Sequence, residues 1–118
     1  MPSIAEDSAF REESARLTGH SNGRCRALGK AIRANLSGVR MYRKALIRNV
    51  SGRRLYGVGH TYEIDDMWLV RVARRIDDLN PRTIQEMTRT LRHEVSHTLG
   101  ATEGPGIEWT AEDYANRC

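Results

Sequence analysis

Long apolar runs, cysteine and aromatic residues are all scarce in this sequence. No apolar run approaches the roughly 20 residues that a membrane-spanning helix needs, so we expect no such helix. One Phe, two Trp and four Tyr among 118 residues predict a mainly aliphatic core. With 39% hydrophobic and 29% charged residues, the composition is that of a globular chain. We therefore expect one domain with one modest core over residues 1–118.

Two cysteines, Cys25 and Cys118, are too few for a disulfide framework. They could pair across the fold, supply a thiol ligand or both remain free, and free thiols in a reducing cytoplasm are the ordinary expectation. The first residues include Glu6 and Asp7 and lack the apolar stretch of a secretory signal. We therefore expect a cytoplasmic protein, with a mature secreted form as the alternative.

Acidic residues are missing from Ala15 to Tyr62, although this stretch carries eleven Arg and Lys residues. The net charge of the whole chain is +4, so the positive charge is concentrated in one half. Such a concentration can attract nucleic acid, an anionic membrane or an acidic substrate. It can equally be a solvated basic surface, and no nucleic-acid motif accompanies it. Segment 16–54 is therefore a candidate site for an anionic partner such as nucleic acid.

Apolar periodicity predicts three longer helices. Ser3–Leu17 could form an amphipathic helix or belong to a partly ordered arm over residues 1–20. Arg24–Leu36 has one apolar face and one basic face, which is typical of a helix packed on a sheet. The third helix should begin at Pro81, with Asn80 as its N-cap, and end at Gly100. Its apolar stripe consists of Ile84, Met87, Leu91, Val95 and Leu99.

Short β-type runs lie between the second and third predicted helices. They cover Val39–Tyr42, Ala45–Val50, Leu55–Ile64 and Met67–Arg74, and the last run is β-branched at its centre. We therefore predict an α+β fold in which a small mixed sheet of three to four strands packs with the third helix and one or two further helices.

The strongest functional signal is His93-Glu94-Val95-Ser96-His97. Four residues apart on a helix, the two imidazoles lie one above the other and can bind one zinc ion through their ring nitrogens. Glu94 is rotated off that line, where it could act as general base on a metal-bound water. The same residues could instead belong to an ordinary solvated helix face. The motif favours His93 and His97 as zinc ligands and Glu94 as the catalytic residue.

These residues resemble the signature of the zincin metallopeptidases. Gly100 and Glu103 extend the likeness, because they stand where the metzincin-type motif has its turn glycine and its third ligand. That ligand is usually His, or Asp in the snapalysin-like branch, and no Met follows His97 to form the family's methionine turn. The resemblance implies a minimal zincin-like α+β domain that hydrolyses peptide bonds with zinc, and Glu103 as the third ligand.

Other donors could complete the site in place of Glu103. They are Glu108, Glu112, Asp113 and Cys118. Glu112 would correspond to the gluzincins, whose third ligand is a Glu on a later helix. Asp113 has a structural explanation, because Thr110 to Asp113 is typical of a capping box at the start of a short final helix.

We therefore expect a zinc-dependent endopeptidase that acts on a protein or peptide substrate. One alternative is a zinc-dependent nucleic-acid hydrolase, since some zinc endoribonucleases resemble this chain in their two-His helix and following glycine but lack the glutamate. The other is a non-enzymatic module stabilised by zinc. The sequence leaves the substrate, the cleavage specificity and the oligomeric state open.

Overall fold

The computed structural model of this chain describes residues 2–42, 46–50, 53–57, 59–64, 67–73, 81–104 and 108–118. Side chains are described for residues 2–39, 41, 81–104 and 108–118. The described α-helices are α1 (Ile4–Thr18), α2 (Gly23–Asn35), α3 (Pro81–Ser96) and α4 (Ala111–Arg117). Two short 3₁₀ turns, η1 (Leu36–Gly38) and η2 (His97–Leu99), follow α2 and α3.

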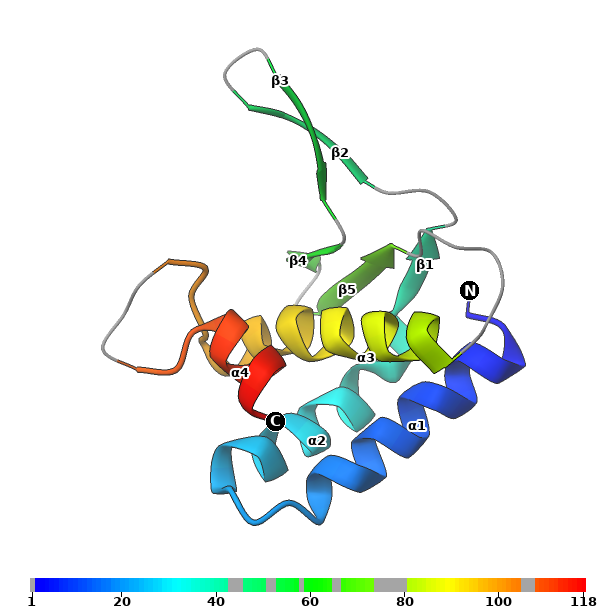
Figure 1. Cartoon of the computed structure of the whole chain (residues 1–118), viewed down its shortest axis with the longest axis vertical. Coiled ribbons are helices and arrows are strands. Elements are labelled where there is room, and N and C mark those ends of the chain that lie inside the picture. Colours follow the sequence, from blue (N-terminus) through cyan, green and yellow to red (C-terminus); the bar gives the residue numbers. More distant parts are fainter. Residues whose placement is uncertain are drawn as a thin grey trace.

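The described parts of the backbone between η1 and α3 form two sets of strands. One is a three-stranded sheet in which β5 (Met67–Ala73) lies between a parallel neighbour, β1 (Arg40–Tyr42), and an antiparallel one, β4 (Gly59–Ile64). The other is an antiparallel pair of β2 (Leu46–Val50) and β3 (Arg53–Gly57). Figure 1 shows this pair projecting from the body, while α3 lies between the three-stranded sheet and the two N-terminal helices.

Helices α1 and α2 form a closely packed helical pair. Ser3 caps α1 in a capping box with Glu6, and Asn22 caps α2 through its side-chain oxygen. At the contact, the Ser14 hydroxyl donates a hydrogen bond to the carbonyl of Gly29 at 2.8 Å. Gly29 permits this approach, because a Cβ there would lie 2.8 Å from the Leu17 Cβ. Helix α1 therefore takes part in the core packing.

The apolar stripe of α3 packs into the core that α1 and α2 begin. Met87, Leu91 and Val95 are buried, as the stripe predicts, whereas Leu99 is exposed. The rest of the buried hydrophobic cluster is Phe10, Leu17, Cys25, Leu28, Ile32, Val39 and Tyr114. Helix α3 begins at Pro81, as expected, and its predicted N-cap, Asn80, lies outside the described residues.

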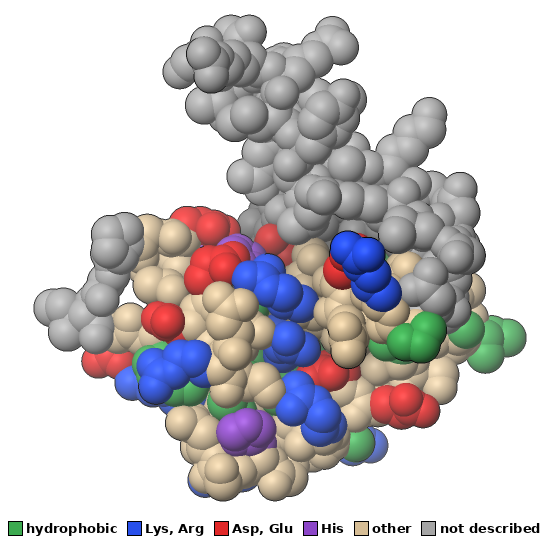
Figure 2. Space-filling view, viewed as in Figure 1, with side chains coloured by type: hydrophobic (Ala, Val, Ile, Leu, Met, Phe, Trp, Pro, Cys, Tyr) green, Lys and Arg blue, Asp and Glu red, His purple; other side chains and the backbone are tan. Residues whose placement is uncertain are grey.

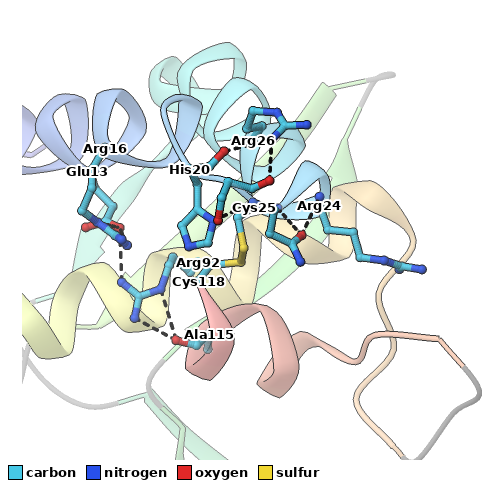
Figure 3. The surroundings of a disulfide bond; sticks show 11 residues. Glu13, Arg16, His20, Arg24, Cys25, Arg26, Arg92, Ala115 and Cys118 are labelled. Carbon is cyan, nitrogen blue, oxygen red and sulfur yellow. Dashed lines mark hydrogen bonds and ion pairs between the residues drawn. A yellow bond between two sulfur atoms is a disulfide. The ribbon is translucent and has the colours of Figure 1, made fainter.

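A disulfide joins Cys25 on α2 to Cys118, the residue that follows α4, with the two Cα atoms 5.5 Å apart. The expectation of free thiols was therefore wrong, and neither sulfur is available as a metal ligand. Figure 3 shows Arg92 of α3 beside this bond, where its guanidinium lies between α1 and α4. It donates two hydrogen bonds to the Ala115 carbonyl, at 2.8 and 3.2 Å, and pairs with Glu13 at 3.4 Å.

The predicted fold class, an α+β minimal zincin-like domain built on a sheet, was wrong. The body whose side chains the structure describes is all-α and consists of four helices. Among these residues, every buried hydrophobic side chain except that of Val39 lies on a helix. The prediction failed because it assigned α1 and α2 to the periphery of a sheet, whereas they pack against each other and against α3. No described helix is long and apolar enough to cross a membrane.

Candidate metal centre

The end of α3 places two histidines side by side. Their rings meet edge to face, with centroids 5.3 Å apart, and the side chains of His93 and His97 are 14% and 17% exposed. The α-helix ends at Ser96, so His97 begins the tighter turn η2 rather than lying within α3 as predicted. Because the stripe of α3 faces the core, both imidazoles stay near the surface and can meet a ligand.

Gly100 turns the chain back toward the two imidazoles. Its φ of 88° is left-handed, a conformation that glycine adopts without steric cost, and its N–H donates to the carbonyl of His97 at 3.1 Å. The N–H of Ala101 then donates to the carbonyl of Ser96 at 3.2 Å. This reversal brings Glu103, six residues after His97, back over the helix end.

One carboxylate oxygen of Glu103 faces both histidines. Its Oε1 atom lies 2.7 Å from the Nε2 atom of His97 and 3.1 Å from the Nε2 atom of His93. The three donor atoms lie within 4.8 Å of one another. Figure 2 shows histidine and acidic side chains close together on one face of the protein. Among the described residues, the structure thus brings together the three ligands that the sequence predicts.

The opposite nitrogen of each imidazole has its own hydrogen-bond partner. The Nδ1 atom of His97 lies 2.9 Å from the Ala101 carbonyl, and the Nδ1 atom of His93 lies 2.9 Å from Glu112 Oε1. Glu112 is itself held by Arg89, whose Nη2 atom is 2.6 Å from Glu112 Oε2. Metal-binding histidines almost always have such an acceptor on the nitrogen that does not face the metal.

These partners determine which imidazole nitrogen carries the proton. A carbonyl oxygen can only accept, so His97 must carry a proton on Nδ1, and the same holds for His93 beside an ionised Glu112. In the neutral imidazoles, both Nε2 lone pairs then point at Glu103, which also offers only lone pairs. Such a group of acceptors requires a cation between them, either protons on the rings or a metal ion.

The donor set fits a zinc ion. Two imidazoles, one carboxylate and an open position are a standard catalytic zinc arrangement. Around a tetrahedral zinc ion with bonds of about 2.0–2.1 Å, neighbouring donor atoms lie roughly 3.3 Å apart, slightly farther than Glu103 lies from the two Nε2 atoms here. The side chain of Glu103 is 66% exposed, so a shift of a few tenths of an ångström costs little.

Both carboxyl groups of the site are ionised at neutral pH. Partial burial by itself would raise the pKa of Glu103, but hydrogen bonds and charge from His93 and His97 outweigh it and hold the pKa below its usual value. Burial likewise opposes ionisation of Glu112, while Arg89 and then His93 bring its pKa below the usual value. Glu103 is therefore negatively charged beside the two Nε2 atoms, and Glu112 is negatively charged beside the Nδ1 atom of His93.

Glu94 lies next to His93 and is almost fully buried, with a side chain 4% exposed. Its Oε1 atom is 3.9 Å from the Nε2 atom of His93, too far for a direct hydrogen bond but within reach through one water molecule. The structure therefore places Glu94 beside the Nε2 atom of His93 and outside the set of three donors.

The competing donors have other partners. Glu108 pairs with Arg24, Asp113 accepts hydrogen bonds from Thr110 in the capping box of α4, and Cys118 is in the disulfide. Glu112 binds the outer nitrogen of His93 and does not face the three donors. Sequence reasoning missed this outer role of Glu112, and its anchor Arg89, because no spacing rule predicts how α4 packs on α3.

Comparison with protein families, characterised proteins and solved structures finds no match for this chain.

Proposed function

We propose that this chain is a zinc-dependent endopeptidase, with His93, His97 and Glu103 as zinc ligands and Glu94 as general base. The observation that carries the proposal is the convergence of both Nε2 atoms on Glu103, with Nδ1 of each ring held by an acceptor. Zinc would supply a Lewis acid that polarises the peptide carbonyl and lowers the pKa of water.

The residues around the site would carry out the proton transfers. Glu94 takes a proton from the water that adds to the peptide carbonyl carbon, and returns it to the amine as the carbon–nitrogen bond breaks. Its burial favours this role, since a carboxylate removed from bulk water keeps its proton transfers within the site. Glu112 and Ala101 keep the two rings in the metal-binding tautomer.

The two alternatives receive less support. A purely structural zinc site is usually closed by four protein ligands, whereas three donors gather among the described residues and one of them, Glu103, is largely exposed. For the nucleic-acid hydrolase, three of the five described basic side chains in segment 16–54 donate to protein acceptors, namely those of Arg16, Arg24 and Arg26. Binding of an anionic partner there stays a prediction, which a steep salt dependence would support.

The cytoplasmic location also stays a prediction. The disulfide between Cys25 and Cys118 favours the alternative, an exported mature form, because such bonds persist mainly in oxidising compartments. An exported peptidase would keep its disulfide intact and would meet its substrates outside the reducing cytoplasm.

The test compares Glu94→Gln with wild type on a broad peptide library after loading with zinc. We expect zinc binding to persist and hydrolysis to fall by about 10²–10⁴-fold, the usual contribution of a general base. Glu86→Gln is the matched control, because Glu86 is an exposed residue of the same helix and, among the described side chains, forms an ion pair with Arg82 alone, at 3.7 Å. A zinc-loaded wild type that cleaves nothing, or a Glu94→Gln variant as active as wild type, would exclude the proposed function.

A further inference from the structure

Glu112 connects the short helix α4 to the metal centre. Its two carboxylate oxygens face different donors: Oε1 lies 2.9 Å from the Nδ1 atom of His93, and Oε2 lies 2.6 Å from the Nη2 atom of Arg89. The guanidinium of Arg89 also donates to the side-chain oxygen of Asn116, at 2.9 and 3.2 Å. Two residues of α4, one turn apart, thus bind α3 at the level of His93.

We propose that Glu112, held in place by Arg89, is a positioning residue that keeps the Nε2 lone pair of His93 directed at the metal. This inference rests on the zinc site of the proposed function and assigns a role outside the three ligands. Glu112 acts by accepting the Nδ1 proton, which fixes both the tautomer and the orientation of the His93 ring.

A carboxylate is required at this position because two donors compete for it. One oxygen accepts from Arg89 while the other accepts from His93, so both are satisfied together. A glutamine has only one acceptor oxygen, and the charged guanidinium would bind it more strongly than a neutral imidazole does. The amide NH₂ would then face Nδ1 of His93 and favour the tautomer whose proton sits on Nε2, where it blocks the metal.

Zinc affinity is the first measurement. Competition with a chromophoric chelator, with zinc alone as the probe, gives the dissociation constant for wild type, Glu112→Gln and Glu108→Gln. Glu108→Gln is the matched control, because Glu108 is an exposed carboxylate that pairs with Arg24 and does not contact the metal centre. We expect affinity to fall about 10–100-fold in Glu112→Gln, the usual effect of losing an outer partner, and to be unchanged in Glu108→Gln.

The imidazole protons are the second measurement, made by NMR on the zinc-loaded proteins. His93 and His97 should each show an Nδ1 proton, and that of His93 should lie farther downfield because its acceptor is charged. In Glu112→Gln we expect the His93 signal to move upfield or to vanish by exchange. The His97 signal, whose acceptor is the Ala101 carbonyl, should stay in place, whereas a general loosening of the fold would move both.

The outcomes separate this inference from the proposed function. Glu112→Gln with the zinc affinity of Glu108→Gln and an unmoved His93 signal would overturn the role of Glu112 while leaving a zinc peptidase intact. A wild type that binds zinc but cleaves no peptide would end the proposed function and leave the Glu112 assignment standing. A wild type that binds no zinc would overturn both.

Discussion

Reduction of the Cys25–Cys118 disulfide should strongly destabilise this protein. The bond links residues 93 positions apart, so it closes nearly the whole chain into one loop. Loop closure lowers the conformational entropy of the unfolded chain. For a loop of about 100 residues, this loss of entropy stabilises the folded state by about 4.7 kcal/mol. The free energy of unfolding of a folded domain is about 5–15 kcal/mol, so the disulfide supplies a large part of the total stability.

Helix α4 should loosen first when the bond is reduced. Its seven residues are too few to form a stable helix alone, so its position depends on tertiary contacts. Those that remain include the buried side chains of Ala111, Tyr114 and Ala115 and the two hydrogen bonds from Arg92 to the Ala115 carbonyl. The contacts of Glu112 and Asn116 with α3 also remain, but they are exposed. We therefore expect the reduced chain to retain α1–α3 and to fray at α4.

Urea unfolding of the metal-free protein, with and without a phosphine reductant, measures this effect. The free energy of unfolding should fall by about 3–5 kcal/mol, and the denaturant slope should rise because the reduced unfolded chain is more expanded. The Cys25→Ala/Cys118→Ala double variant is the control, and the reductant should not change its midpoint. An unchanged midpoint in wild type, with both thiols shown to be reduced, would refute the reasoning.

Two further predictions concern the helices that position the site. Gly29→Ala should lower the free energy of unfolding by about 1–3 kcal/mol despite the helix preference of alanine, because the new Cβ would lie 2.8 Å from the Leu17 Cβ and from a backbone nitrogen. Urea melts should show Gly23→Ala to be near neutral, because a Cβ there would meet, among the described residues, a flexible Arg side chain at 3.4 Å. Thr110→Ala should cost about 1 kcal/mol at neutral pH. The pKa of Asp113 lies below its usual value first because the backbone N–H of Thr110 donates to its carboxylate, and second because the Thr110 hydroxyl does. The variant keeps the first hydrogen bond and loses the second. The contribution of the hydroxyl to the carboxylate exists above the unfolded pKa of about 3.9 and is lost as the pH falls through the lower folded value, so equal losses of stability at acid and neutral pH would contradict it.

Local sequence signals predicted the grouping of His93, His97 and Glu103 better than they predicted the fold. The first histidine, the carboxylate beside it and the glycine turn are fixed by spacing along one helix and its end, which a periodicity argument captures. Glu103 could be placed because only a few residues separate it from Gly100. Such short-range relations survive even when the surrounding architecture differs from what is expected.

The long-range relations could not be predicted. The contact between Ser14 and Gly29 and the bond between Cys25 and Cys118 depend on how helices pack, and neither has a signature in the local sequence. The α+β expectation failed for this reason, since alternating apolar runs indicate strands but not which elements form the core. Glu112 was considered as a metal ligand, whereas it lies on the outer side of His93.

The disulfide and the candidate metal centre are connected through α4. Cys118 ties the end of this helix to α2, and Glu112, less than two turns earlier, binds the outer nitrogen of His93. A helix this short cannot hold Glu112 in place by itself, so the geometry at His93 depends on the covalent link. Linkage is reciprocal. If reduction of the disulfide lowers the zinc affinity by a given factor, bound zinc must therefore make the disulfide harder to reduce by the same factor. A zinc centre built this way would be most stable in an oxidising environment, where the bond that fixes α4 persists.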